Sequence, residues 1–283
     1  MIAPGFHSDL PFPDYLAIER LSPSGAKGLL GQSPAHYRFH RDHPPAETAA
    51  MRVGKATHSL ALEGREAFAA AFAVAPECDR RTTVGKGIWA DFLAASEGRT
   101  VLTASEAEQV EAMAAGILAH PLAPDLIEGG TPELSMIWTD PETGAPCKGR
   151  ADLARLADGV IVDLKTALTA APGDFARSVL SYGYHCQAAA YLAGAAALGA
   201  EVRDFIILAV EKSPPFSVGI YRLPDAALEL GRRRWAEACR TYAACVESGR
   251  WPGYSETITE LTLPGWALSE LYADSDESTD KGE

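Results

Sequence analysis

Apolar residues at helical spacing, bounded by capping residues, recur in the first and last parts of the chain. Ser22 is expected to cap the first predicted helix, and Ser33-Pro34 to begin the second. Gly64 closes a third helix, which contains His58. The predicted helices span 23–31, 34–41, 47–62, 103–120, 175–180, 185–198 and 225–247.

Segments rich in β-branched residues, several of them alternating with polar ones, predict strands in the middle of the chain. Asp158-Gly159 lies between two of these segments and predicts a two-residue hairpin turn. The predicted strands span 68–74, 133–139, 148–156, 160–165, 203–210 and 217–223. The order of helices, a three-strand meander, helices, two strands and a helix predicts an α/β (α+β) fold. Its central mixed sheet would be flanked by helices.

Three segments lack a clear hydrophobic period. Residues 1–21 are rich in proline, so we expect an irregular N-terminal arm. Residues 77–99 are expected to form a loop and a short helix. Residues 273–283 are mostly Asp, Glu, Ser and Thr, which predicts an acidic disordered tail. One folded domain is expected between the two ends, over 22–272.

The composition restricts the class of protein. The chain has 283 residues, of which 47% are hydrophobic and 22% charged, and its formal net charge is −13. An acidic protein repels nucleic acid over most of its surface, so binding to DNA would need a local site. No apolar stretch approaches the ~20 residues of a membrane span, and residues 1–15 resemble no targeting peptide. We therefore expect a cytoplasmic location and no membrane partner.

The predicted hairpin carries three charged side chains. With a two-residue turn, Asp152 would lie opposite Lys165 and diagonal to Asp163, and all three would project from one face. A one-residue bulge would instead send Asp152 to the opposite face. The residues expected to point the other way, into an apolar layer, are Val160, Val162 and Leu164.

The presence of two aspartates and a lysine together on this hairpin requires a physical explanation. Asp163 lies in an apolar run, where a buried unpaired carboxylate costs on the order of several kcal/mol, and Asp152 nearby would add repulsion. A hard divalent cation, Mg²⁺ or Mn²⁺, would remove both costs. Lys165 could then orient a metal-bound water or stabilise charge on a phosphate. The alternative is a cross-strand salt bridge between Asp152 and Lys165, with Asp163 facing solvent.

Further polar residues are candidates for the same site. Gln187 and Tyr191 share one helix face and could meet a phosphate or Lys165, or could belong to a half-buried amphipathic face. His58 follows Gly54 by one helical turn and is a site residue or an ordinary helical histidine. The sequence leaves the roles of Glu63 and Glu133 open.

Four motifs occur in order between Ser22 and Trp266 and together resemble one superfamily. They are Leu21-Ser22-Pro23-Ser24 with Ser33-Pro34-Ala35-His36-Tyr37; Gly54-Lys55-Ala56-Thr57-His58 with Leu62-Glu63; Gly149-Arg150-Ala151-Asp152 with Asp163-Leu164-Lys165; and Tyr182-Gly183-Tyr184-His185-Cys186-Gln187 with Tyr191. This set resembles the PD-(D/E)xK nucleases in their RecB-like branch. Within that branch it is most similar to the RecE-type nuclease domain of exodeoxyribonuclease VIII from phages and prophages.

The resemblance implies a restriction-endonuclease-like core and a set of site residues. It makes Lys165 the catalytic lysine, with Mg²⁺ or Mn²⁺ as the cofactor. Gln187 and Tyr191 would support the site and contact DNA. The implied metal ligands are His58, Asp152, Asp163 and the carbonyl of Leu164.

Iron–sulfur relatives in the same branch need clustered cysteines. The five cysteines here are scattered and form no C-x-x-C pair, so we predict no iron–sulfur cluster, and equally no zinc ribbon.

The function that the resemblance implies is a metal-dependent exonuclease acting on double-stranded DNA ends, 5′-to-3′, in phage-type recombination. It further implies a single-strand annealing protein as partner, a ring-like homo-oligomer, and the cytoplasm of a bacterial or phage-infected cell. A structure-selective or restriction-like endonuclease on the same fold is the first alternative. A non-catalytic DNA-binding or interaction protein is the second.

Overall fold

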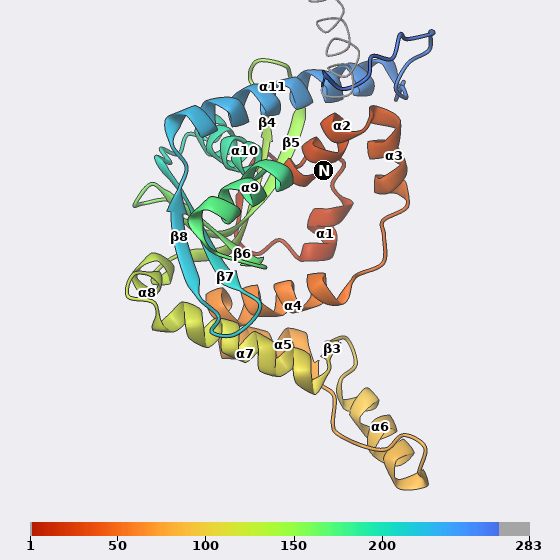
Figure 1. Cartoon of the computed structure of the whole chain (residues 1–283), viewed down its shortest axis with the longest axis vertical. Helices are drawn as coiled ribbons and strands as arrows, with labels where there is room; N and C mark the ends of the chain where they lie inside the picture. Colours follow the sequence, from red (N-terminus) through yellow and green to blue (C-terminus); the bar gives the residue numbers. More distant parts are fainter. Residues whose placement is uncertain (1, 266–283) are drawn as a thin grey trace, which may run out of the picture.

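A six-stranded mixed sheet runs through the middle of the molecule (Figure 1). The computed structural model describes residues 2–265. Strands β6 and β7 are parallel, and the other neighbours in the sheet are antiparallel. In spatial order the strands are β1 (Gly5–His7), β4 (Thr131–Thr139), β5 (Pro146–Arg155), β6 (Val160–Ala167), β7 (Asp204–Glu211) and β8 (Val218–Arg222). The predicted α/β fold with a central mixed sheet is confirmed.

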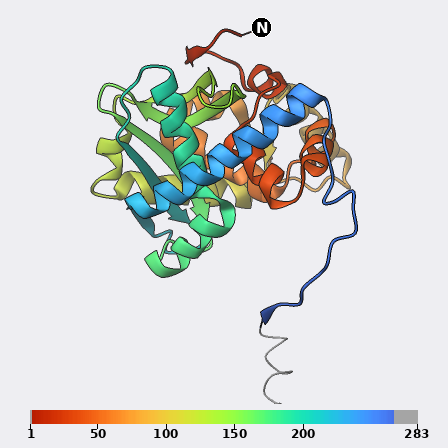
Figure 2. The ribbon, with the colours of Figure 1, turned by 90° about the horizontal axis from the view of Figure 1, so that it is seen from above.

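Helices cover both faces of this sheet (Figures 1 and 2). One face packs around Trp138 and Trp235, and the other around Met113 and Leu164. The first face is covered by α2 (Pro23–Gly31), α3 (Pro34–Asp42), α9 (Pro172–Tyr182), α10 (Tyr184–Ala197) and α11 (Asp225–Ser248). The second is covered by α4 (Ala49–His58), η1 (Ser59–Glu63), α5 (Arg65–Ala71), α7 (Ala104–Ala119) and α8 (Ala123–Ile127).

Side-chain caps explain where several helices begin. Ser22 and Ser33 accept hydrogen bonds from the backbone N–H groups of Gly25 and His36, as the Ser-Pro pairs predict. Thr103 and Glu106 form a capping box at the start of α7. The helix predicted over 47–62 begins at Ala49, is regular through His58 and then widens into the π-helical turn η1, which ends at Glu63 and is capped by Gly64 with a φ of 93°.

The prediction of an irregular arm at 1–21 is wrong. Residues 5–7 form β1, which pairs with β4 at the edge of the main sheet, and Phe12–Ala17 form helix α1. The prolines in this segment interrupt any clear hydrophobic period, so neither element could be predicted from the pattern. The strand that pairs with β1 lies more than 120 residues further along the chain. The boundary of the predicted domain at 22 stays a prediction, and the predicted tail at 273–283 lies outside the described residues.

The segment between α4 and α7 is more helical than its pattern suggests. The predicted strand 68–74 is mostly α5, and only β2 (Phe72–Val74) is extended, pairing in parallel with β3 (Thr100–Leu102). The predicted short helix within 77–99 is the 13-residue α6 (Thr83–Ala95), which projects from the body (Figure 1). Helix α8 also escaped prediction. Within residues 2–265 we find no helix that is both long and apolar enough to cross a membrane.

The hairpin of β5 and β6 has a longer turn than predicted. Arg155 pairs with Val160, so four residues connect the strands where Asp158-Gly159 alone predicts two. Gly159 N–H donates to Leu156 O at 3.2 Å within this turn. The register therefore shifts by two residues. Because side chains alternate with a period of two, a shift of two leaves each side chain on its predicted face.

Helices α10 and α11 cross closely at Gly231. A β-carbon there would lie 2.1 Å from the carbonyl oxygen of His185, whereas one at Gly28 in α2 would meet nothing within 4 Å. We expect Gly231→Ala to lower the free energy of unfolding by about 1–3 kcal/mol, through overpacking against backbone. Gly28→Ala should raise it by about 0.5–1 kcal/mol. Urea denaturation of both variants is the measurement, and equal effects would contradict the close crossing.

Candidate active site

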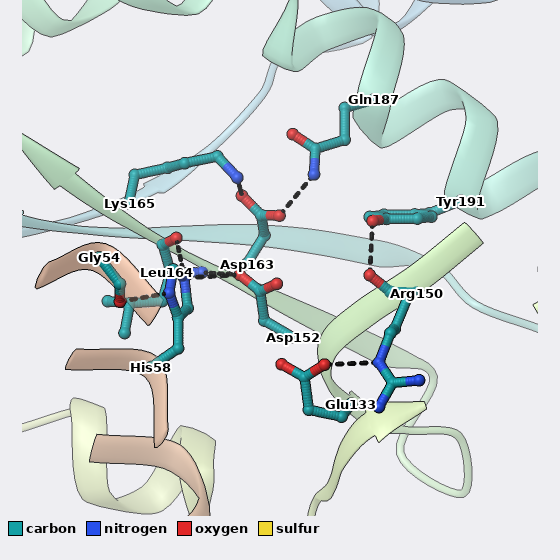
Figure 3. Close-up of polar contacts among 10 residues, drawn as sticks. All are labelled: Gly54, His58, Glu133, Arg150, Asp152, Asp163, Leu164, Lys165, Gln187 and Tyr191. Carbon is teal, nitrogen blue, oxygen red and sulfur yellow. Dashed lines mark hydrogen bonds and ion pairs between the residues drawn. The ribbon is translucent and has the colours of Figure 1, made fainter. Parts of the chain in front are cut away.

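The regular pairing of β5 with β6 ends at Leu153 and Val162, and the candidate site begins there (Figure 3). Extending the register by one residue sets Asp152 opposite Asp163, where the notional two-residue turn had set it opposite Lys165. Beyond this point the backbone of β6 bonds to side chains instead of to the backbone of β5. Asp152 Oδ2 accepts a hydrogen bond from Leu164 N–H at 2.8 Å.

Asp163 is completely buried and is held from two sides. Gln187 Nε2, from α10, donates to Oδ1 at 2.8 Å, and Lys165 Nζ lies 2.5 Å from Oδ2. Burial, with a smaller effect of Asp152, raises the pKa of Asp163, and Lys165 lowers it. The net effect is a pKa raised to about 6. Burial lowers the pKa of Lys165, but the two carboxylates outweigh burial and hold it above its usual value. Lys165 is therefore an ammonium at neutral pH.

His58 joins α4 to the hairpin. Its Nδ1 faces Gly54 O at 2.8 Å, and its Nε2 faces Leu164 O at 2.7 Å and Asp152 Oδ2 at 3.1 Å. Because a carbonyl only accepts hydrogen bonds, both ring nitrogens must carry protons for both contacts to form. Burial lowers the pKa of His58, but the carboxylate of Asp152 and the hydrogen bonds outweigh it and raise the pKa to about 9.

Gly149 and Tyr191 form a support behind β5. The hydroxyl of Tyr191 donates to Arg150 O at 2.6 Å, and a β-carbon at Gly149 would lie 2.7 Å from the Tyr191 ring. The glycine of the Gly-Arg-Ala-Asp motif is therefore required by the close approach of this ring. Tyr191 is only 5% exposed, a place that suits support of the strand better than contact with DNA.

Arg150 has a larger part in the site than its sequence position suggested. Its guanidinium donates to Glu133 Oε2 at 2.6 Å, to Leu10 O at 2.7 Å and to Ser135 Oγ at 3.0 Å. The role left open for Glu133 is thus pairing with this arginine. The arginine of the Gly-Arg-Ala-Asp motif was the available signal, but its partners lie on β4 and before α1, far away in sequence.

The alternative of a simple cross-strand salt bridge is wrong. Lys165 pairs with Asp163 and not with Asp152, and Asp163 faces the interior instead of solvent. The predicted apolar layer on the other face is confirmed, because Val162 and Leu164 lie in the core beneath α4 and α7.

The donor set fits a hard divalent cation in its chemistry. Asp152 and Asp163 supply carboxylates and Leu164 a carbonyl, and Asp163 Oδ2 has an ion-pair partner but no well-directed hydrogen bond. His58 would join them as an imidazole only by giving up the Nε2 proton that it directs at Leu164 O. Within residues 2–265, no three His, Cys, Asp or Glu side chains are already gathered as a metal cluster. The ligand assignment therefore stays a prediction.

The mixed sheet, with Asp152, Asp163 and Lys165 at the open end of one hairpin, agrees with what the sequence resemblance implies. The chain belongs to the family described as the PDDEXK-like domain of unknown function DUF3799, whose profile matches residues 22–263.

The chain resembles several solved structures, among them the following two. A candidate exonuclease from Eubacterium rectale has a TM-score of 0.56 and 18% identity, covering 89% of this chain and 92% of that one. A phage-related exonuclease from Haemophilus somnus has a TM-score of 0.33 and 12% identity, covering 83% and 99%. The first likeness shows a shared fold. No curated protein matches the chain.

The raised pKa of His58 makes its contribution to stability depend on pH. Because the folded pKa of about 9 lies above the unfolded value, this contribution is complete below pH ~6.5 and is lost as pH rises through 9. We expect the cost of His58→Gln, measured by urea denaturation with a chelator present, to shrink by on the order of 3 kcal/mol between pH 6 and pH 10. Exposed His40→Gln is the control, and a cost independent of pH would contradict the charged state of His58.

Proposed function

We propose that this chain is a metal-dependent exodeoxyribonuclease that hydrolyses phosphodiester bonds at double-stranded DNA ends. The observation that carries the proposal is the convergence of Asp152, Asp163 and Lys165 at the open end of one hairpin, with Lys165 Nζ 2.5 Å from Asp163. Membership of the PDDEXK-like family supports a nuclease. The likeness to a candidate exonuclease in fold supports action on ends.

The residues of the chain divide the chemistry between them. Asp152, Asp163 and the Leu164 carbonyl would hold Mg²⁺ or Mn²⁺, joined by His58 once its Nε2 proton is lost, and the metal would polarise a phosphoryl oxygen and lower the pKa of a bound water. Lys165 presents a fixed positive charge to the phosphate, where negative charge grows as the water oxygen bonds to phosphorus. The bond from phosphorus to the leaving sugar oxygen breaks, the attacking water releases a proton to solvent, and the leaving oxygen takes up a proton from solvent, so that protons balance. Gln187 keeps Asp163 in the orientation that Lys165 requires.

The finer assignment rests on the order of the four sequence motifs. It places the chain in the RecB-like branch near the RecE-type enzymes, with 5′-to-3′ digestion and release of mononucleotides. A single-strand annealing protein as partner, a ring-like homo-oligomer and a role in phage-type recombination belong to the same proposal.

Digestion of labelled DNA by matched variants tests the site. With Mg²⁺, the wild-type protein should degrade linear duplex and leave closed circular duplex intact. Lys165→Met should lower the rate about 10²–10³-fold, because it removes one fixed charge beside the reacting phosphate. Asp163→Asn should lower it at least as much. Asp158→Asn changes an aspartate in the turn of the same hairpin, outside the site, and should leave the rate unchanged.

Other results of this digestion experiment would contradict parts of the proposal. Cleavage of closed circles would replace the exonuclease with an endonuclease on the same fold. Retained digestion by Asp163→Asn would move the active site elsewhere. Labels at the 5′ and the 3′ end, released in separate reactions, decide the polarity.

A further inference from the structure

A pocket of about 410 Å³ opens directly beside the candidate active site. His58 and Asp152 line one side of it, so it is continuous with the site. Phe72 and two alanines of α5, Ala67 and Ala71, line another side, and Phe12 of α1 contributes an aromatic wall. Neither the metal chemistry nor the lysine accounts for this mixture of apolar surface and charge.

The aromatic wall comes from a segment that precedes the family match. Helix α1 ends before residue 22, where the match begins, yet it is fastened to the strand that carries Asp152. Lys148 Nζ, buried on β5, donates to Tyr15 O at 2.7 Å, to Ile18 O at 2.8 Å and to Leu16 O at 3.2 Å. Arg150 reaches Leu10 O just ahead of the helix. These bonds hold α1 at the pocket as a fixed part of its wall.

Phe12 remains 40% exposed although it lies on a well-anchored helix. Its ring lies nearly parallel to the buried Tyr15 ring, with an interplanar angle of 18° and centroids 6.3 Å apart. Two cations surround it, since Lys55 Nζ is 5.4 Å and the Arg150 guanidinium carbon 5.6 Å from its centroid. The pocket thus offers a supported aromatic ring beside positive charge.

Acidic and basic side chains line the pocket together. Three carboxylates face three basic side chains. The acidic members are Glu63, Glu133 and Asp152, and the basic members are Lys55, His58 and Arg150. A phosphate group entering the pocket therefore meets the cations Lys55 and Arg150 beside these carboxylates, although the chain as a whole carries −13.

We propose that this pocket binds one unpaired nucleotide at the end of a DNA strand, with its base against Phe12 and its phosphate toward Asp152 and His58. The inference rests on the proposed nuclease function and specifies its substrate. A volume of 410 Å³ is typical of a site for a small molecule, and it admits one nucleotide but not a base pair with both backbones. Stacking on an aromatic ring accepts any base, because every base has a π face.

A preference among DNA ends follows from this pocket. A paired terminal base must leave its partner before it enters, and unpairing costs a few kcal/mol, least where the end is mismatched. The enzyme should therefore digest frayed or mismatched ends faster than fully paired ones, with little dependence on base identity.

The test has a binding arm and a cleavage arm. For binding, a duplex with an unpaired terminal 2-aminopurine is titrated with full-length protein in a chelator, where no cleavage occurs. Stacking on Phe12 should quench the fluorescence, and Phe12→Ala should abolish the quench. For cleavage of the same end with Mg²⁺, Phe12→Ala should raise KM about 5- to 150-fold, the equivalent of one lost stacking contact.

Three further variants keep the outcome clear. Phe12→Trp should restore both quench and KM. Ala71→Trp, at an exposed position of the opposite wall, should fill the pocket and act like Phe12→Ala without touching α1. Phe39→Ala removes an exposed phenylalanine outside the pocket and should match the wild-type protein.

The two proposals fail separately. A quench that depends on Phe12 in a protein that cuts no DNA would support the pocket and overturn the nuclease. The contrary result is a protein that digests DNA with the same quench and the same KM in the wild type, in Phe12→Ala and in Ala71→Trp. That outcome would support the nuclease and overturn the pocket. Equal KM values for paired and mismatched ends would likewise overturn it.

Discussion

The end of the β5–β6 ladder is the constraint on which the site depends. Regular pairing stops at Leu153 and Val162, and the backbone N–H and C=O of Leu164 lie beyond it. A buried backbone group without a partner costs about 1–3 kcal/mol, so both groups require side chains to meet them. Asp152 and His58 supply these partners. The same hydrogen bonds therefore close the open edge of β6 and fix two candidate metal ligands in place.

The charged groups at this point, of which Asp163 is buried and the others half-buried, depend on one another. Two carboxylates, Asp152 and Asp163, share the space with two cations, His58 and Lys165, and the group as a whole is neutral. Removing any one member would leave a buried or half-buried charge without its counterpart, which is more costly than an exposed one. This local balance explains how a strongly acidic chain could still accept a phosphate at the site.

The residues of the site come from different secondary-structure elements. Asp163 and Lys165 lie on a central strand, Gln187 on the helix that packs over it, and His58 on a helix beneath the opposite face. Helix α1 adds a wall although it precedes the region that defines the family. The rigid sheet brings these together, because every one of them is bonded to β5 or β6 or to a residue on them.

The sequence by itself determined most helices, the main strands and the face on which Asp152, Asp163 and Lys165 lie, because spacing and capping are local properties of the chain. It did not determine the turn length of the hairpin, the pairing of Lys165 with Asp163, or the part played by Arg150. Nor did it reveal β1 and α1 in residues 1–21. The strand β1, the helix α1 and the contacts of Arg150 depend on partners far apart in the chain, which only the packed tertiary structure brings together. Lys165 and Asp163 are two residues apart, and their pairing depends on the burial of Asp163 beside Gln187 of α10.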